Sequence, residues 1–546
     1  TGAYAANTGV NNTKAIIDSS TIGTDTDKAN AINVHAKDNT VLKGIAGTVN
    51  VEVGGTTVGL NLGGSVVNNK IGDSKTKQEV LAQINNSSVK LAEAAKLNVK
   101  AENYADILSV AAGGAVGVSK GIVDIGTSGS VAVDNIYTLT DASMTDTDIN
   151  SGSTKAGNVN LEAISDTKVV TTADALSVNV DLGKVAGGAM ATVAKVNSDA
   201  DTTAGIYGKE KDNKATQNVK NETVKADSKN KITNVAVGLN GTGGVGIASV
   251  GVLANVAINK IANDTKAEVN NAKISADNLG VLAASNEQIN NYGGALNVSV
   301  NVGKAGVGLG ATTVVNTILG DTTALVNNSE LEVSGAGEGI TLGQEKKKGL
   351  IVNADSAHTL NDISVTAGIA GSALAGVAVN ATTGVNKISG ATKAQVLNTD
   401  INKNKLEADY ENADVSIKAN DNTKVSAHVG TLTVGLAGVA GIAAGASVDN
   451  NKFDRAVTAE FVGSSDKNIV QAKNIDINAV NTSKILLTES GASIGGGATA
   501  GIGVTGAVSV DHFTGKTFAN LNNAKVTSAG DVKVEADSLK DSATYT

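Results

Sequence analysis

Apolar and polar residues alternate with a period of two over much of this chain. Clear examples are VNVEV (49–53), LSVNVDL (176–182), LNVSVNV (296–302) and VKVEA (532–536). Such alternation is typical of β-strands with one buried face, because successive side chains point to opposite faces of a sheet. Helical periodicity is sparse, and we expect at most one short helix or loop insertion, at 75–96, where the segment LAEAAK is rich in alanine.

An alanine recurs in a fixed frame, apolar–x–apolar–x–Ala, and marks a repeat. Its nine copies are Ala36, Ala101, Ala163, Ala226, Ala283, Ala354, Ala419, Ala479 and Ala536, and successive copies are 57 to 71 residues apart. Repetition at a near-constant spacing indicates stacked units that bury their apolar faces against one another. We therefore expect a partial repeat over 1–35, eight tandem repeats over 36–535, each beginning near one of the first eight alanines, and the start of a further repeat over 536–546.

A second landmark, Asn-x-Ile, follows most of these alanines by about thirty residues and supports the same frame. The best copies are Asn69-Lys70-Ile71, Asn259-Lys260-Ile261, Asn316-Thr317-Ile318, Asn386-Lys387-Ile388 and Asn451-Lys452-Phe453. The weakest copy is Ala194-Lys195-Val196. Strand–turn–strand units without helices, repeated at this spacing, predict an all-β parallel β-helix. Because a coil of such a solenoid takes about twenty residues, one repeat should form about three coils, and the chain a rod on the order of 120 Å.

The composition fits stacked strands and excludes several kinds of site. The 546 residues include no Cys, Pro or Trp, and 2% are aromatic, whereas 63 are Gly. Small and β-branched residues fill regular layers, and a chain without Pro keeps its backbone N–H groups for pairing. The lack of Cys excludes disulfides and thiolate metal sites. A net charge of −9 without a basic patch makes nucleic acid an unexpected partner.

Several short strings imitate enzyme motifs, but their contexts are wrong. Residues 117–121 match G-x-S-x-G, yet no helix follows them. Residues 241–246 match G-x-G-x-x-G without a βαβ context, and Gly515-Lys516-Thr517 has Val510 where a phosphate-binding loop needs its first Gly. We therefore expect no enzyme and no cofactor site.

The sequence predicts no metal or catalytic residues. The four histidines, which occupy different repeat positions, are His35, His358, His428 and His512. The acidic turn residues, which lack the glycine spacing of calcium-binding repeats, are Asp25, Asp27, Asp141, Asp146 and Asp148. Metal sites and catalytic triads need side chains that converge, so we interpret these residues as ordinary turn and surface positions.

Uncharged Gly/Ala-rich blocks recur in nearly every repeat. Residues 429–448 are the clearest block, and 364–385 and 490–510 are similar. Each is long enough to cross a bilayer as a helix, but Gly weakens helices, and the blocks recur in register. We therefore favour core strands over a membrane-active role. Three departures from the repeat, at 201–223, 335–350 and 465–474, are expected to be loops projecting from one face.

The V-x-V-x-A frame, the Gly/Ala blocks such as 237–261 and the T-x-A-x-V-x-N segments resemble the large exoproteins that Gram-negative bacteria secrete by type V routes. These include filamentous-haemagglutinin-like proteins, autotransporter adhesins and fusobacterial-type leukotoxins. The resemblance covers nearly the whole chain and carries over no functional residue. It implies a right-handed β-helical shaft, displayed at the bacterial surface or released, which uses an outer-membrane β-barrel transporter during secretion.

The resemblance and the repeat together favour a non-enzymatic adhesive stalk of a surface or secreted exoprotein. Its partner would be a receptor on a host or bacterial cell, and membrane insertion is disfavoured. Two alternatives stay open, the shaft of a leukotoxin-like cytotoxin and a structural filament or biofilm-matrix protein. Because the chain starts without Met and its last residues follow Ala536 closely, we expect a segment of a longer protein.

Overall fold

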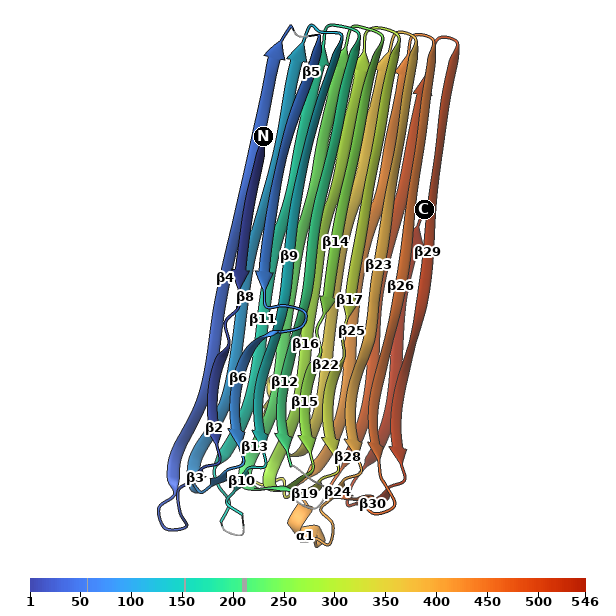
Figure 1. Cartoon of the computed structure of the whole chain (residues 1–546). Helices are drawn as coiled ribbons and strands as arrows, with labels where there is room; N and C mark the ends of the chain where they lie inside the picture. Colours follow the sequence, from blue (N-terminus) through green and yellow to red (C-terminus); the bar gives the residue numbers. More distant parts are fainter. Residues whose placement is uncertain (56, 152–153, 209–213) are drawn as a thin grey trace.

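The chain folds into a flat solenoid of long parallel strands (Figure 1). This computed structural model describes residues 1–55, 57–151, 154–208 and 214–546. Two large parallel sheets, of 16 and 13 strands, are called sheet 1 and sheet 2 below. The all-β parallel solenoid predicted from the alternation and the repeat is confirmed.

Sheet 1 contains the long strands that carry the repeated alanines. They are β4 (Ala29–Gly54), β8 (Leu91–Ser119), β11 (Asn158–Asp181), β13 (Ala215–Gly244), β16 (Ala272–Asn301), β22 (Gly349–Ser372), β25 (Asp414–Ala437), β28 (Ile475–Gly496) and β31 (Val532–Tyr545). Each pairs in parallel with the next, and the alanines lie opposite one another, from Ala36 with Ala101 to Ala479 with Ala536. The alanine frame is therefore one unbroken ladder across the sheet.

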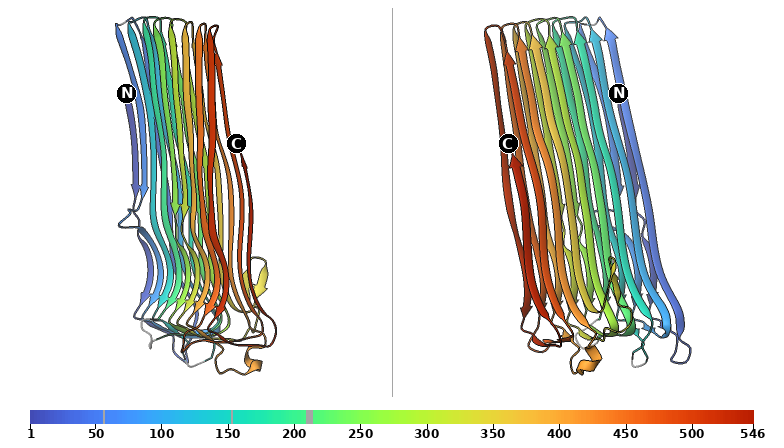
Figure 2. Two further views of the ribbon diagram at one scale, coloured as in Figure 1. Left: turned by 90° about the vertical axis from the view of Figure 1, so that its right-hand side faces the viewer. Right: turned by 180° about the vertical axis from the view of Figure 1, so that it is seen from behind.

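Sheet 2 is built from the strands that return along the molecule. They are β1 (Gly2–Gly9), β2 (Thr13–Asp18), β5 (Val58–Ile71), β6 (Gln78–Asn85), β9 (Val123–Thr145), β12 (Val185–Tyr207), β14 (Ala248–Ala262), β15 (Thr265–Asn270), β17 (Ala305–Leu319), β18 (Thr322–Asn327), β23 (Ala375–Leu397), β26 (Ala440–Val462) and β29 (Ala500–Asn522). Figure 2 shows that the two sheets form a slab whose strands run its full length.

Short elements close each coil at one end of the slab. Short strands that extend sheet 1 there are β3 (Thr21–Ile22), β7 (Ser88–Val89), β10 (Asp148–Ile149), β19 (Glu330–Val333), β24 (Asp400–Ile401), β27 (Ile469–Ala472) and β30 (Lys525–Ser528). The same end carries a hairpin of β20 (Ile340–Leu342) with β21 (Glu345–Lys347) and the single-turn helix α1 (Glu407–Tyr410). We call it the loop end; tight turns connect sheet 1 to sheet 2 at the opposite end (Figure 1).

One repeat forms one coil, so the expectation of three coils per repeat is wrong. Lys100, for example, lies opposite Glu162, and Glu162 lies opposite Lys225, one repeat further along the chain. The glycines of the Gly/Ala-rich blocks do not end the strands of sheet 1, because many of them lie inside continuous strands of 22 to 30 residues. Pairing on both sides holds these glycines in extended backbone, and no Pro interrupts the ladder.

The expected rod of about 120 Å is wrong for the same reason. Nine coils at ~4.8 Å each stack to only about 40 Å, whereas a strand of 24 residues at ~3.3 Å per residue is about 80 Å long. The long dimension of the molecule therefore runs along the strands. Each further repeat adds one coil to the stack and so extends the molecule along its short dimension.

The helix considered at 75–96 is absent, and the segment consists of β6, β7 and the start of β8. Val80, Ala82 and Ile84 are buried at every second position of β6, which pairs with β2 and β9. Tertiary pairing thus overrides the local helix propensity. The expected loop at 201–223 is also wrong, because its described residues mostly extend β12 and begin β13, and the 465–474 segment includes β27. The 335–350 segment does project, as the β20–β21 hairpin.

The core changes character along the strands. Next to the loop end it is apolar, with fully buried Leu97, Leu161 and Ile206 among its members. Further from the loops it narrows to a row of isoleucines and then to a row of alanines, represented by Ile261 and Ala257. The large apolar core thus lies in the loop-end half of the slab.

The Asn-x-Ile landmark forms a buried amide ladder in sheet 2. Asn259 donates to Asn316 at 2.8 Å, Asn316 to Asn386 at 2.9 Å, and Asn386 to Asn451 at 2.9 Å. Each buried amide therefore has a partner in the next coil, as a buried polar group needs. The ladder is interrupted at Val196. The copy expected at Ala194-Lys195-Val196 is two residues out of register, because Val196-Asn197-Ser198 lies opposite Asn259-Lys260-Ile261.

Candidate functional site

Part-way along the long strands, the apolar residues change from the inward-facing positions to the outward-facing positions. In β13, Val224 and Ile232 are buried between the sheets, whereas Val237 and Leu239 point outward. The pairing of β13 continues through this region without a register shift. Because successive side chains point to opposite faces, the change of phase moves the apolar residues to the outside.

The outward apolar residues of sheet 1 lie in register across the slab. One row contains Val49, Leu176, Leu239, Leu296 and Leu432, on successive or nearby strands. Val49 is 72% exposed and the four leucines are 39% to 43% exposed. Neighbouring rows add the exposed side chains of Val53, Val118, Val180, Val300, Ile369, Leu436 and Ile494. This half of sheet 1 is a continuous apolar surface.

Sheet 2 and the connecting turns continue this surface around the slab. Val252, Leu309 and Val379 face outward in register on β14, β17 and β23. The turns add the exposed side chains of Ile122, Leu182, Val245, Ile247, Val302, Leu374 and Val439. We call this part of the molecule, from the turns to the level of Lys231 on sheet 1 and Lys260 on sheet 2, the apolar end. A soluble monomer rarely exposes so extensive an apolar patch.

The interior of the apolar end is small and polar. Asn179 donates to the Gly187 carbonyl at 3.0 Å, Asn240 to the Gly188 carbonyl at 3.2 Å, and Asn297 to the Leu309 carbonyl at 2.8 Å. Each of these asparagines is at most 2% exposed. The polarity of the apolar end is therefore inverted, with amides inside and aliphatic side chains outside.

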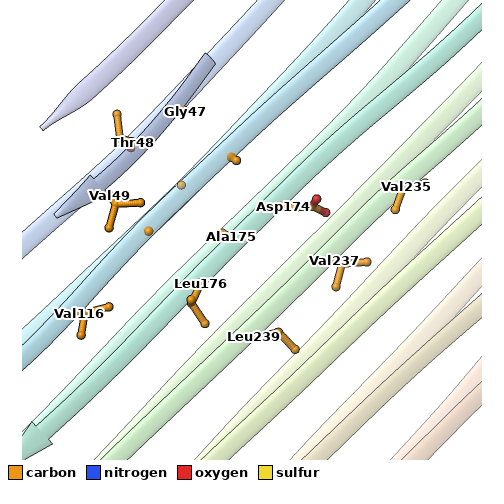
Figure 3. Close-up of a pocket in the computed structure, with 13 residues that line it drawn as sticks. Gly47, Thr48, Val49, Val116, Asp174, Ala175, Leu176, Val235, Val237 and Leu239 are labelled. Carbon is orange, nitrogen blue, oxygen red and sulfur yellow. The ribbon is translucent and has the colours of Figure 1, made fainter. Parts of the chain in front are cut away.

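A shallow groove crosses the apolar surface of sheet 1 (Figure 3). It has a volume of about 640 Å³, and small residues such as Gly47 and Gly114 form its floor between Val49, Leu176 and Leu239. Its one acidic lining residue is Asp174, and burial raises the pKa of that carboxyl, although the backbone N–H of Val237 opposes the shift. The groove is thus suited to apolar groups.

The uncharged blocks of the sequence coincide with the apolar end. Residues 429–448 comprise the last part of β25, the turn at Gly438 and the first part of β26. They are strands, as the sequence analysis favoured, but alternate residues such as Leu432 and Leu436 face outward. The outward-facing apolar surface was not predicted from the sequence. The sequence does contain a signal for it, because the apolar residues of β13 change from even-numbered positions (Val224, Ala226 and Ile232) to odd-numbered positions (Val235, Val237 and Leu239).

The enzyme-like strings and the histidines lie apart from one another. Ser119, from the G-x-S-x-G match, is buried at the end of β8, and its Oγ accepts a hydrogen bond from the Gly121 N–H. His35 faces outward from β4 and contacts Glu102 at 2.8 Å. The interpretation of His358 as a turn or surface residue is wrong, because it is buried in β22, 3.2 Å from Glu287. Among the described residues no group of three or more His, Asp or Glu side chains could hold a metal ion.

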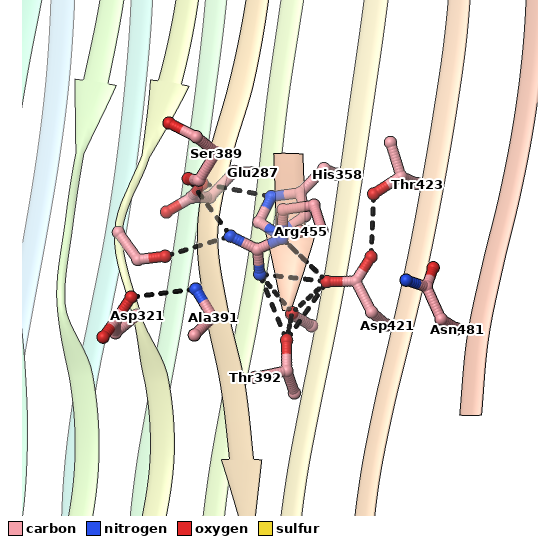
Figure 4. Close-up of polar contacts among 12 residues, drawn as sticks. Glu287, Asp321, His358, Ser389, Ala391, Thr392, Asp421, Thr423, Arg455 and Asn481 are labelled. Atoms are coloured by element: carbon pink, nitrogen blue, oxygen red, sulfur yellow. Dashed lines mark hydrogen bonds and ion pairs between the residues drawn. The ribbon is translucent and has the colours of Figure 1, made fainter. Parts of the chain in front are cut away.

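Arg455, the only arginine, anchors a buried ionic cluster in the loop-end half (Figure 4). It lies 2.9 Å from Asp421 and donates to the carbonyls of Gly320 and Ser389 at 3.1 and 3.2 Å. Burial alone would raise the pKa of Asp421, but Arg455 and the neighbouring His358 hold it below its ordinary value. Because Arg455 is 3% exposed, the cluster joins coils rather than offering a binding surface, and the sequence analysis missed it.

Comparisons of this chain with protein-family models, with curated proteins and with solved structures find no match. Among the described residues, none of the helices is long and apolar enough to cross a membrane. Of the features described above, the apolar end is therefore the strongest candidate site, and it rests on the geometry of this chain alone.

Proposed function

We propose that this protein is an extracellular attachment module whose apolar end inserts into a lipid bilayer. The observation that carries the proposal is the inverted polarity of that end, where both outer faces and the turns are apolar and the interior is amide-lined. A receptor surface would need one apolar patch. Apolar residues on both outer faces and at the turns instead suit a medium that covers the whole end.

The length of the apolar end suits a bilayer. From Lys231 to the last residue of β13, Gly244, the strand covers 14 residues, and the 13 steps between them span about 43 Å at ~3.3 Å per residue. A bilayer is about 40–45 Å thick with its headgroups, and its hydrocarbon core is about 30 Å. Lys120, Lys184 and Lys304 lie at the turns, so a fully inserted end would bring them to the far headgroup layer.

The exposed aliphatic area favours insertion. Fully burying an exposed Leu or Val is worth about 1.5–3 kcal/mol, so a side chain that is two-fifths exposed would gain on the order of 1 kcal/mol. The apolar end carries more than ten such side chains. Their sum, on the order of 10 kcal/mol, is comparable to the roughly 4–15 kcal/mol that association costs. The strand edges of the first and last coils are unpaired, and each unpaired backbone group costs several kcal/mol in hydrocarbon. This cost grows with the depth of insertion, so the depth is the quantity to measure.

Flotation with neutral phosphatidylcholine vesicles at about 0.5 M salt, where ionic attraction is screened, tests the proposal. The wild-type protein should float with the vesicles. The double variant Leu176→Glu with Leu432→Glu should stay behind, whereas the matched variant Asn160→Glu with Asn422→Glu, on the same strands outside the apolar end, should float. The proposal fails if the wild type does not bind or if the two variants bind alike.

Tryptophan fluorescence would measure the depth, since the chain contains no Trp. A Leu296→Trp variant should be quenched by lipids brominated in their acyl chains, and a Ser416→Trp variant, on sheet 1 nearer the loop end, should not. Equal quenching of both would exclude end-on insertion. Gly438, in the turn between β25 and β26, is a poor position for a probe because an added Cβ would lie 2.3 Å from the Ala373 carbonyl oxygen.

The wider biological role that we propose is attachment of a secreted bacterial exoprotein to cells. The repeated β-solenoid supports the resemblance to type V-secreted adhesins and leukotoxins, and with it a bacterial surface or extracellular location. In an adhesin the inserted end would hold the protein on a target membrane. In a cytotoxin the same insertion would also release a dye trapped in the vesicles, so a release assay separates these two roles.

Attachment to a cell-surface receptor is a second candidate, favoured by a polar groove at the loop end. The β20–β21 hairpin stands over sheet 1 and encloses about 390 Å³ lined by Asn158, Asn221, Lys225 and Asp355 among others. Replacing residues 340–347 with a short glycine linker should abolish cell binding if the groove holds the receptor. Unchanged binding would instead leave attachment to the apolar end.

A further inference from the structure

A row of lysines crosses each sheet where the apolar end begins. On sheet 2 the middle residue of the Asn-x-Ile landmark points outward, and Lys260, Lys387 and Lys452 lie at equivalent register positions. On sheet 1, Lys168 lies opposite Lys231, and Lys424 lies opposite Lys484. Together with Lys70, which lies at the same level of sheet 2, these residues form what we call the lysine collar.

All but one of the eight collar lysines lack an ionic partner. Lys70 pairs with Asp73, but the other seven make no ion pair with any residue that the structure describes. Nearer the loop end most lysines are paired, for example Lys100 with Glu162 at 3.3 Å and Lys418 with Asp476 at 2.6 Å. Unpaired ammonium groups at one level are free to meet an external anion.

The charge balance of the collar is positive although the chain is acidic. Five outward carboxylates, Asp106, Asp166, Asp199, Asp454 and Asp541, lie at or next to this level, against seven unpaired lysines. The net charge of the whole chain is −9. The sequence hides this patch because its members are about sixty residues apart, and stacking the coils brings them together.

We propose that the lysine collar binds the phosphate groups of anionic lipids at the near surface of the bilayer. This inference rests on the proposed insertion of the apolar end, because insertion places the collar among the headgroups. Lysine stems can lie along the apolar surface while their ammonium groups reach the phosphates. The collar would therefore select anionic bilayers and stop insertion at a defined depth.

Flotation with two kinds of vesicle tests this inference. One is pure phosphatidylcholine, and the other contains about 30 mol% phosphatidylglycerol, both at about 0.1 M salt. Because a lysine near an anionic surface contributes roughly fivefold in affinity, the wild type should prefer the anionic vesicles by roughly 10- to 100-fold. The variant with Lys231, Lys260, Lys424 and Lys452 each replaced by Gln should lose most of this preference and still bind neutral vesicles.

A matched control removes the same charge near the loop end. In it Lys14, Lys266, Lys418 and Lys533, two on each sheet, are replaced by Gln, and it should keep the wild-type preference. Equal binding of the wild type to both vesicles, or an unchanged preference in the collar variant, would overturn the collar while insertion stands. No binding to either vesicle would overturn both proposals. Binding of inorganic phosphate without vesicle preference would also overturn the assignment to lipid.

Discussion

The loop-end half and the apolar end are made from the same strands but bury opposite sets of residues. Leu161, on β11 in the loop-end half, is fully buried, whereas Leu176, fifteen residues further along the same strand, is 41% exposed. The parallel pairing of β11 with β8 and β13 runs through both positions. Backbone pairing therefore does not depend on which face is apolar.

The difference teaches that one half stabilises the fold and the other is available for function. In the loop-end half the aliphatic side chains meet between the sheets, and the outward charges are neutralised in pairs such as Lys225 with Glu162. In the apolar end the amides fix the two sheets together, and the aliphatic side chains have no protein neighbours outside. Three predictions test this division.

The largest loss of stability should come from the buried ion pair of the loop-end half. Replacing Arg455→Met leaves Asp421 charged and buried, which should cost about 3–5 kcal/mol of the free energy of unfolding. Urea denaturation measures the loss. The double variant Arg455→Met with Asp421→Asn should recover part of it, and a single variant as stable as the wild type would show that the cluster does not hold the coils.

The second prediction compares the same substitution at a buried leucine and at an exposed leucine. Leu161→Ala creates a cavity in the core and should cost about 2–5 kcal/mol. Leu239→Ala, on the outer face of the apolar end, should change stability by only about 0.5 kcal/mol but should weaken vesicle binding. Equal losses of stability in the two variants would contradict the division between the halves.

The smallest effect is a pH dependence from Glu222, a carboxyl that is fully buried in β13. Burial raises its pKa from 4.5 to about 8. The pKa of Glu222 is higher in the folded protein than in the unfolded chain. The stability that the protonated carboxyl contributes is therefore fully present below about pH 4.5 and is lost as the pH rises towards 8. The midpoint of thermal unfolding should fall by a few degrees from pH 6 to pH 9. The variant Glu222→Gln should fall less, and an equal fall in both would contradict the assignment.

Much of the fold could be predicted, because equivalent residues of successive repeats lie opposite one another in the paired strands. The alanine frame and the Asn-x-Ile landmark are ladders in the structure. The weakest copy, expected at Ala194-Lys195-Val196, was placed two residues out of register, since Val196 lies opposite Asn259. The number of coils could not be predicted, since glycines inside a strand and glycines at a turn look alike in one chain. Arg455 was missed because its partner Asp421 lies 34 residues away and meets it only after stacking.

The sequence by itself determined the repeat, the strands and the alternation, because pairing of like residues in neighbouring coils needs only a constant spacing. Only the tertiary structure decided which alternate residues face outward at the apolar end. A bulge between Ile232 and Val235 would have turned the second apolar set inward, but the ladder runs straight through these residues. Since each inner strand is paired on both sides across this level, none of them can rotate alone, and their aliphatic side chains stay outside.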